Sequence, residues 1–166
     1  MTNETLLPPH IGCFICDPSV PTSMGIRWYG QPDGKSVRGT VTLGITHQGP
    51  PNHAHGGSSA AILDDIMGTC AWYAGYMSMT GKMTVTYHRP VPLNVALTIA
   101  ARVVDQQGRK IFISAEIKMP NGDILVGSEG LFIEIPEMFQ AGITEENMGE
   151  YLGQIVAGKR MRGEVG

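Results

Sequence analysis

The sequence lacks long apolar runs, has few cysteines and carries little charge of either sign. No stretch approaches the roughly 20 consecutive apolar residues of a membrane-spanning helix, so we expect no membrane partner. The start, MTNETLLPPH, lacks the basic end and long apolar middle of a secretory signal, which favours a cytoplasmic location. The formal net charge of -3 argues against a nucleic-acid binder that relies on a general positive field.

The three cysteines are too few and too unevenly placed for a disulfide framework. An odd number of cysteines suits a reducing compartment. The segment CFIC, Cys13 to Cys16, resembles half of a zinc site, but no second pair follows and Cys70 falls within an expected buried helix. We therefore interpret the pair as small apolar side chains and expect no metal site. A metal would need a histidine brought close by folding, from among His10, His47, His53 and His55.

What the chain does have is the length and apolar content of one globular domain. It contains 166 residues, of which 42% are hydrophobic. Residues 1–23 carry four prolines and no sustained periodicity, so we expect an extended lead-in that packs late or loosely. Alternating apolar residues and turn signals such as PDG and PNG predict six strands. These strands are expected at 24–30, 36–46, 82–92, 97–106, 109–119 and 124–135.

One long helix is expected between the second and third of these strands. The prolines of QGPPNHAHGG exclude a helix over residues 48–57, so this segment is a loop. An apolar run of about 18 residues begins at Ser58, with Ser58 or Ser59 available as a cap. A helix this apolar must be covered on most of its surface. The order therefore predicts an α+β hotdog fold, in which a curved antiparallel sheet of about six strands wraps around one long central helix.

Two aspartates lie on the side of this helix that does not face the sheet. Asp64 is bordered by small apolar residues, so we expect it to be the more desolvated of the two, with a pKa raised toward the range of a general base. Asp65 is expected on an ordinary solvated face. At the start of the helix, Gly56 and Gly57 have no Cβ that would keep a ligand from the unpaired backbone N–H groups. A carbonyl oxygen that becomes negative is stabilised at such a helix end.

These motifs resemble the acyl-CoA thioesterases of the hotdog fold, the PaaI-like group. The resemblance rests on HGGSSAAILDDIMG followed by TGKMTVTYHRPVP, with an aspartate nine positions after the histidine, and it extends from about residue 13 to residue 135. The lead-in also resembles the Cys-x-x-Cys segment that some members carry. The resemblance implies hydrolysis of an acyl-CoA thioester to a carboxylic acid and CoA, without a metal or organic cofactor.

The resemblance also implies roles for individual residues. The Gly56 N–H polarises the thioester carbonyl, His55 and Gly57 shape the turn, and Asp64 is the catalytic carboxylate. Thr80 falls where relatives often have a hydroxyl residue that places the carboxylate or the water. Asp64 acts either as general base or as nucleophile, and both routes remain open. Some relatives have an asparagine at position 49, where this chain has glycine, and Asn52 is the candidate to replace it. Two further candidate contacts to substrate are Arg89, for the CoA phosphates, and Met67, for the acyl group.

The helix geometry predicts a homodimer. Gly56 and Asp64 are eight residues apart, or about 12 Å along one helix, too far to serve the same carbonyl. Two sites at a dimer interface solve this problem, each with the helix start of one subunit facing the aspartate of the other. Related thioesterases are built this way, and pairs of dimers form tetramers in some of them.

Two other function classes fit parts of the sequence. A non-catalytic acyl-CoA-binding module is the main alternative, and it would bind acyl-CoA without turnover. A hotdog dehydratase or hydratase fits less well, because His55 before two glycines does not match its pairing of histidine and carboxylate. We divide the chain into an N-terminal lead-in (1–23), a hotdog domain (24–135) and a C-terminal part (136–166), in which residues 144–158 are expected to form a helix before a basic tail.

Overall fold

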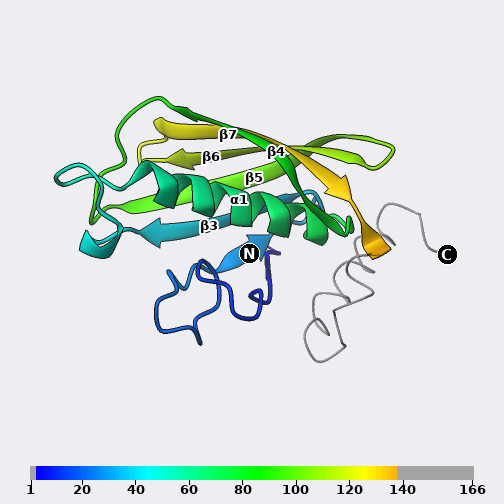
Figure 1. Ribbon diagram of the computed structural model, residues 1–166, viewed down its shortest axis with the longest axis horizontal. Helices are drawn as coiled ribbons and strands as arrows, with labels where there is room; N and C mark the ends of the chain where they lie inside the picture. Colours follow the sequence, from blue (N-terminus) through cyan, green and yellow to red (C-terminus); the bar gives the residue numbers. More distant parts are fainter. Residues whose placement is uncertain (1–2, 138–166) are drawn as a thin grey trace.

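The computed structural model describes residues 3–137, which form one antiparallel sheet and one long helix (Figure 1). The helix α1, Gly56–Tyr73, lies across one face of the sheet. The seven strands have the spatial order β1-β2-β3-β5-β6-β7-β4. Their bounds are β1 Thr5–Leu6, β2 Trp28–Gly30, β3 Ser36–Thr42, β4 Ser78–Tyr87, β5 Ala96–Gln107, β6 Lys110–Lys118 and β7 Ile124–Glu134.

The predicted α+β hotdog architecture is confirmed, with one strand more than expected. The additional strand is β1, in the lead-in, where Thr5 pairs with Gly30 and Leu6 with Tyr29 of β2. Two residues are too few to show an alternating pattern, so no periodicity indicated this strand. A short 3-10 helix, Ile45–His47, precedes the loop that leads to α1.

The core lies between α1 and the long strands β5, β6 and β7. After the exposed Lys110, strand β6 alternates buried and half-buried residues, as expected for a strand with one face on the helix. The β5–β6 and β6–β7 hairpins turn at Gly108 (φ +57°) and Gly122 (φ +92°), where other residues would be strained. The helix contributes its bulky side chains to this core, and five of them have no exposed surface: Ile62, Leu63, Ile66, Met67 and Cys70.

Strand β4 lies at one edge of the sheet. It follows α1 in the chain, pairs antiparallel with β7 and has no partner strand on its other side within the described residues. A bulge between Thr80 and Lys82 interrupts its register. Most of its residues are exposed, among them Met79 and Tyr87. A ten-residue edge strand with exposed apolar side chains is a site at which a second chain can pair.

The expectation that the lead-in packs loosely is wrong. Ile15 and Cys16 are each only 2% exposed. The Ile26 N–H donates to the carbonyl of Ile15, and the Asp17 carboxylate accepts hydrogen bonds from the Gly12 and Ser19 N–H groups. The prolines remove regular periodicity from this segment without preventing a compact series of turns.

In the part of the chain that the structure describes, no helix has the length and apolar character needed to cross a membrane. The predicted C-terminal helix at 144–158 and the basic tail lie outside the described residues.

Candidate functional site

The start of α1 is built differently from the sequence expectation. The helix begins at Gly56, two residues before Ser58, and His55 is its N-cap in place of a serine. The His55 side chain turns back and its Nδ1 accepts a hydrogen bond from the Gly57 N–H at 2.9 Å. An imidazole acceptor satisfies one of the free donors of the first turn, as serine or aspartate caps usually do. This geometry supports the expected structural role of His55, which is to shape the turn before α1.

The glycine pair makes room for two neighbouring side chains. A Cβ on Gly56 would lie 3.3 Å from the Tyr87 hydroxyl oxygen, and a Cβ on Gly57 would lie 3.0 Å from His55 Nδ1. The Tyr87 hydroxyl donates to the Gly56 carbonyl at 2.8 Å, which ties the helix start to the end of β4. The Gly56 N–H itself donates to no acceptor in residues 3–137. One backbone donor at the positive end of α1 is therefore available to a ligand.

A cavity of about 400 Å³ adjoins this helix start. The Ser59 hydroxyl lies at this cavity, is almost fully buried, and has no hydrogen-bond partner among the described residues. From the sequence, Ser59 is predicted only as a candidate helix cap. The missed signal is its spacing of three residues from Gly56, which places both on one helix face. The cavity is lined by Pro50, His53, Ala54, Gly56, Ser59, Tyr87, His88, Arg89, Pro90 and Val91.

Asp64 and Thr80 form a second polar site, further along α1. The Thr80 hydroxyl donates to Asp64 Oδ1 at 2.6 Å, so the structure brings together the two residues that the family resemblance paired. A smaller cavity, of about 170 Å³, is lined by both residues together with His10, Asp65, Gly68, Trp72, Ser78, Met79 and Phe132. Gly56 does not line this cavity. Within one chain, the available N–H and the candidate carboxylate therefore lie at different places.

The expectation about which aspartate is desolvated is wrong. The side chain of Asp65 is 9% exposed, and its Oδ2 accepts a hydrogen bond from Trp28 Nε1–H at 2.7 Å. Burial alone would raise the pKa of Asp65, but hydrogen bonds from His10 and Trp28 outweigh it and hold the pKa below its usual value. A helical projection gives the direction of each side chain, but it does not show that the lead-in covers the Asp65 face.

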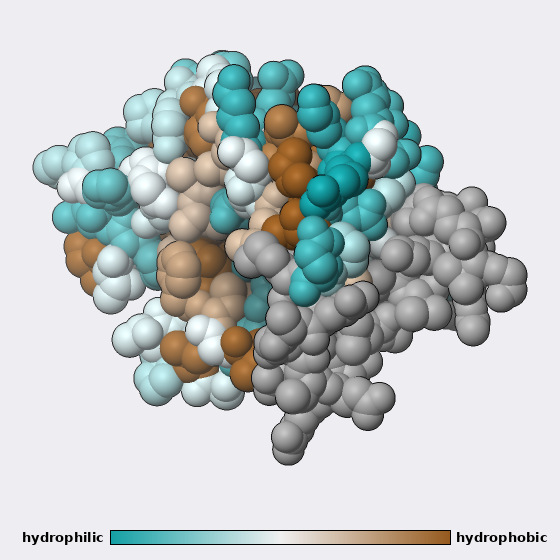
Figure 2. Space-filling view, turned by 45° about the vertical axis from the view of Figure 1, so that its right-hand side comes forward, coloured by the Kyte–Doolittle hydropathy of each residue, from teal (hydrophilic) through white to brown (hydrophobic). Residues whose placement is uncertain are grey.

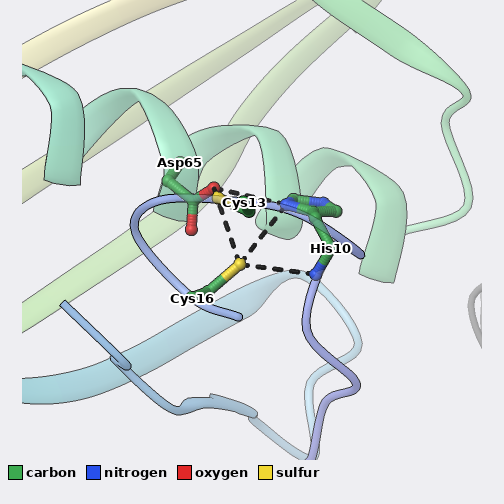
Figure 3. A group of neighbouring side chains, drawn as sticks. All are labelled: His10, Cys13, Cys16 and Asp65. Atoms are coloured by element: carbon green, nitrogen blue, oxygen red, sulfur yellow. Dashed lines mark hydrogen bonds and ion pairs between the residues drawn. The ribbon is translucent and has the colours of Figure 1, made fainter. Parts of the chain in front are cut away.

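The interpretation of Cys13 and Cys16 as apolar side chains is also wrong. Folding brings both sulfurs together with His10 and Asp65, and one ligand-type atom from each residue lies within 4.8 Å of the others (Figure 3). The Cys16 thiol hydrogen-bonds to the Cys13 sulfur and lowers the pKa of Cys13 to about 5, whereas the pKa of Cys16 is raised. Burial would lower the pKa of His10, but its hydrogen bonds to Asp65 and Cys13 raise it to about 9.

The remaining sequence candidates are dispersed. Arg89 lies at the larger cavity, where its guanidinium forms an exposed ion pair with Asp123 at 2.6 Å. Asn52 occupies a left-handed turn (φ +63°), and its backbone N–H donates to the Gln48 side chain. Met67 has no exposed surface and packs in the core, so it lines neither cavity described above.

Gly49 stands where some related thioesterases have an asparagine, and the structure gives a reason for glycine. A Cβ at position 49 would lie 2.8 Å from the His55 Cα, closer than real Cβ contacts. The chain folds back here, with the Gly49 N–H donating to the His53 carbonyl. An asparagine side chain at this position would require the loop before α1 to move.

Comparison with known proteins finds similar sequences among the thioesterases. Residues 51–125 match a family model described as the thioesterase superfamily. The chain is 33% identical over 105 residues to mouse acyl-coenzyme A thioesterase THEM4, a match that covers 61% of this chain and 45% of the mouse protein. The chain thus spans less than half the length of the THEM4 relatives that it matches.

Two solved structures share the fold. The thioesterase superfamily protein RHA08564 is 42% identical, with a TM-score of 0.65, over 68% of this chain and 55% of that one. The PaaI protein of the E. coli phenylacetic acid degradation operon has a TM-score of 0.64 over 72% of this chain and 86% of that one, at 18% identity. The first supports the family resemblance in sequence and structure, and the second supports the fold.

Proposed function

We propose that this chain, whose hotdog domain belongs to the thioesterase superfamily, hydrolyses acyl-CoA thioesters to a carboxylic acid and CoA. The observation that carries the proposal is the available Gly56 N–H at the start of α1, beside a cavity of about 400 Å³. A thioester carbonyl placed there gains a donor aimed at the oxygen on which negative charge develops during hydrolysis.

Asp64 supplies the second half of the chemistry. As general base it takes a proton from water while the water oxygen adds to the carbonyl carbon. The tetrahedral intermediate then expels CoA as thiolate, which takes up the proton. As nucleophile, Asp64 would attack the carbonyl carbon and expel CoA as thiolate, which leaves an anhydride that water hydrolyses to the carboxylic acid and free Asp64. In either route the hydrogen bond from Thr80 to Oδ1 fixes the carboxylate and leaves Oδ2 for the reaction.

Arg89 is our candidate for the nucleotide end of CoA. Its exposed guanidinium stands at the same cavity as Gly56, and a guanidinium binds phosphate oxygens in bidentate fashion. The ion pair with Asp123 is exposed, so exchanging it for a phosphate costs little. The unpaired Ser59 hydroxyl is a candidate contact to the thioester group.

We further propose a homodimer in which each site combines the helix start of one subunit with Asp64 of the other. Gly56 and Asp64 line separate cavities and are about 12 Å apart along α1, so one subunit does not unite them. The exposed edge strand β4, which carries Thr80 and Tyr87, is the surface on which we expect the second copy to pair. Figure 2 shows apolar side chains gathered in the middle of the displayed face, with mostly hydrophilic ones above them.

The direct test is release of free thiol from a panel of aryl and aliphatic acyl-CoAs by the purified protein. The informative variant is Gly56→Pro, which deletes the N–H while keeping the helix start. Proline is favoured at the first position of a helix, and His55 already has the extended backbone (φ −63°, ψ 137°) that a residue before proline needs. Gly56→Ala is the matched control, because it adds a Cβ and retains the donor.

We expect Gly56→Pro to lower kcat by about 10²–10³, the effect of losing one oxyanion donor, and Gly56→Ala to stay within a few fold of wild type. Binding of acyl-CoA by the wild type without thiol release from any substrate would refute hydrolysis and favour the acyl-CoA-binding module. Equal losses in both variants would show that the N–H is not the donor.

The shared site has its own test, in which inactive variants are mixed. Co-expressed Gly56→Pro and Asp64→Asn chains form some mixed dimers, each with one site that has both intact groups. If the site is shared, the mixture regains about one quarter of wild-type activity, because half of the dimers are mixed and half of their sites are intact. Activity no higher than that of the separate variants, in a preparation shown to contain mixed dimers, would place both groups in one subunit.

We also propose a reducing compartment such as the cytoplasm. All three cysteines are free thiols in the structure, although Cys13 and Cys16 are close neighbours. Fractionation of the source cells, followed by detection of the protein, tests this location.

A further inference from the structure

The cluster of His10, Cys13, Cys16 and Asp65 has the shape of a tetrahedral metal site (Figure 3). At usual zinc–ligand distances, the edges of such a tetrahedron measure about 3.3 Å between nitrogen and oxygen and up to about 3.8 Å between sulfurs. From Asp65 Oδ1, the distances are 3.2 Å to His10 Nδ1, 3.3 Å to Cys13 Sγ and 3.8 Å to Cys16 Sγ. The distance from Cys16 Sγ to His10 Nδ1 is 3.6 Å.

From this geometry we propose that these four residues bind one Zn²⁺ ion. Two thiolates, an imidazole and a carboxylate make a donor set of the kind that zinc takes in proteins, and sulfur ligands disfavour calcium and magnesium. None of the four residues is Gly56, Asp64 or Thr80, although His10 and Asp65 also line the smaller cavity, and the inference holds whether or not the chain is a hydrolase.

The backbone supports both sulfurs as ligands. The Ile15 N–H donates to Cys13 Sγ at 3.3 Å, and the His10 N–H donates to Cys16 Sγ at 3.4 Å. Hydrogen bonds from N–H groups stabilise the negative charge of thiolate ligands. The compact turns of the lead-in direct the two sulfurs inward, which a pair of merely apolar side chains would not require.

The carboxylate is also held as a ligand would be. Asp65 Oδ1 faces the other three residues, while Oδ2 accepts the hydrogen bond from Trp28 Nε1–H at 2.7 Å. Trp28 is buried in strand β2, so its indole fixes the orientation of the carboxylate. Such a second partner is typical of ligating side chains and sets which oxygen meets the metal.

The charge of the cluster favours a cation. In the described residues the only ion pair of Asp65 is with His10, so once both cysteines ionise, the largely buried cluster would hold three negative charges against one imidazole. Buried charges are costly unless they are paired or coordinate a metal. A divalent ion would leave a net charge of about −1 with neutral histidine.

The ion would be structural. Four protein ligands complete a tetrahedral site and leave no position for substrate. Three ligands come from the lead-in and the fourth from the middle of α1, so the ion would fasten residues 10–16 to the central helix. The lead-in would thereby become a fixed part of the domain.

The test is the metal content of the full-length protein, purified under reducing conditions with Zn²⁺ supplied. We expect one Zn²⁺ per chain by plasma mass spectrometry, and less than a tenth of that in Cys13→Ser, Cys16→Ser and Asp65→Asn. The matched controls are Asp64→Asn, which changes the adjacent aspartate, and Cys70→Ala, which removes the cysteine outside the cluster. Both controls should keep the full zinc content. Zinc that is absent from the wild type, or retained by the three ligand variants, would overturn the site.

A second measurement needs no variant and is therefore independent of misfolding. Cys13 and Cys16 of the zinc-loaded wild type should resist a thiol reagent and react after chelation, while the fully buried Cys70 stays protected throughout. Replacement by Co²⁺ should give the visible absorption of a tetrahedral ion with thiolate ligands. A Cys13–Cys16 disulfide in freshly purified protein that takes up neither ion would assign the pair to redox chemistry and contradict the proposal.

Discussion

Asp64 and Asp65 are consecutive residues of α1, yet they face different parts of the molecule. Asp64 points to the edge strand β4 and is hydrogen-bonded by the Thr80 hydroxyl. Asp65 points to the lead-in and is surrounded by His10, two thiols and the Trp28 indole. A turn of about 100° per residue separates the two directions. Identical side chains thus acquire different chemistry from the segment that covers each one.

The difference shows how the same helix can serve two purposes. On the β4 side, the carboxylate is half-buried, lines a cavity and has one hydroxyl partner, so it is open to substrate and water. On the lead-in side, the carboxylate is nearly enclosed and both of its oxygens have partners. We propose the first as the reactive carboxylate and the second as a ligand of the zinc ion.

The largest expected effect comes from exchanging each aspartate for asparagine separately. Asp64→Asn should lower kcat for acyl-CoA hydrolysis by about 10²–10⁴, because the amide neither accepts the proton nor attacks the carbonyl. Its zinc content and its melting temperature should stay close to wild type. Asp65→Asn should do the reverse, losing zinc and melting temperature while the folded fraction keeps kcat within a few fold. Thiol release, metal analysis and thermal unfolding of the two variants measure these effects. Equal losses of activity in both variants would contradict the assignment of catalysis to Asp64 and zinc binding to Asp65.

A smaller effect is expected from the partner of Asp65. Trp28→Phe keeps most of the buried ring and removes the N–H that orients the carboxylate. We expect zinc affinity to fall about 10- to 100-fold, as is usual when a second partner of a metal ligand is lost, with kcat unchanged. Competition with a chromogenic chelator measures the affinity. An unchanged affinity in a folded variant would show that the indole only fills space.

The smallest of these effects is expected at the partner of Asp64. Thr80→Val keeps the size of the side chain and removes the hydroxyl that donates to Oδ1. A hydrogen bond to a charged group contributes about 1.5–3 kcal/mol, and because this one is exposed we take the lower end and expect kcat to fall about tenfold while zinc affinity stays constant. Thr80→Ser is the control, because it retains the donor and should recover most of the activity. If valine and serine gave the same kcat, the hydroxyl would have no positioning role.

Much of the fold follows from local patterns in the sequence. The apolar run after residue 58 predicted one buried helix, and alternation with Gly-containing turns predicted the long strands and their hairpins. The helix start was misplaced by two residues, because histidine is not among the usual caps and two glycines rarely open a helix. The pairing of Asp64 with Thr80 was reached through the family resemblance, since sixteen residues separate them in the chain.

The zinc-type cluster shows what sequence reasoning missed. His10, Cys13 and Cys16 lie close together in the chain, and a search for a nearby fourth ligand would have ended there. The fourth residue, Asp65, is 49 positions beyond Cys16 and carries no sign of its role. Only the fold brings it to the lead-in.

Local sequence patterns specify the helix, the long strands, the turns and the residue types available for chemistry, because these depend on periodicity and on the backbone preferences of single residues. The tertiary structure alone decided which aspartate is enclosed, which side chains meet at the helix start and what covers each face of α1. Those outcomes depend on contacts between residues far apart in the chain, whose burial and hydrogen bonds set the environment of each group.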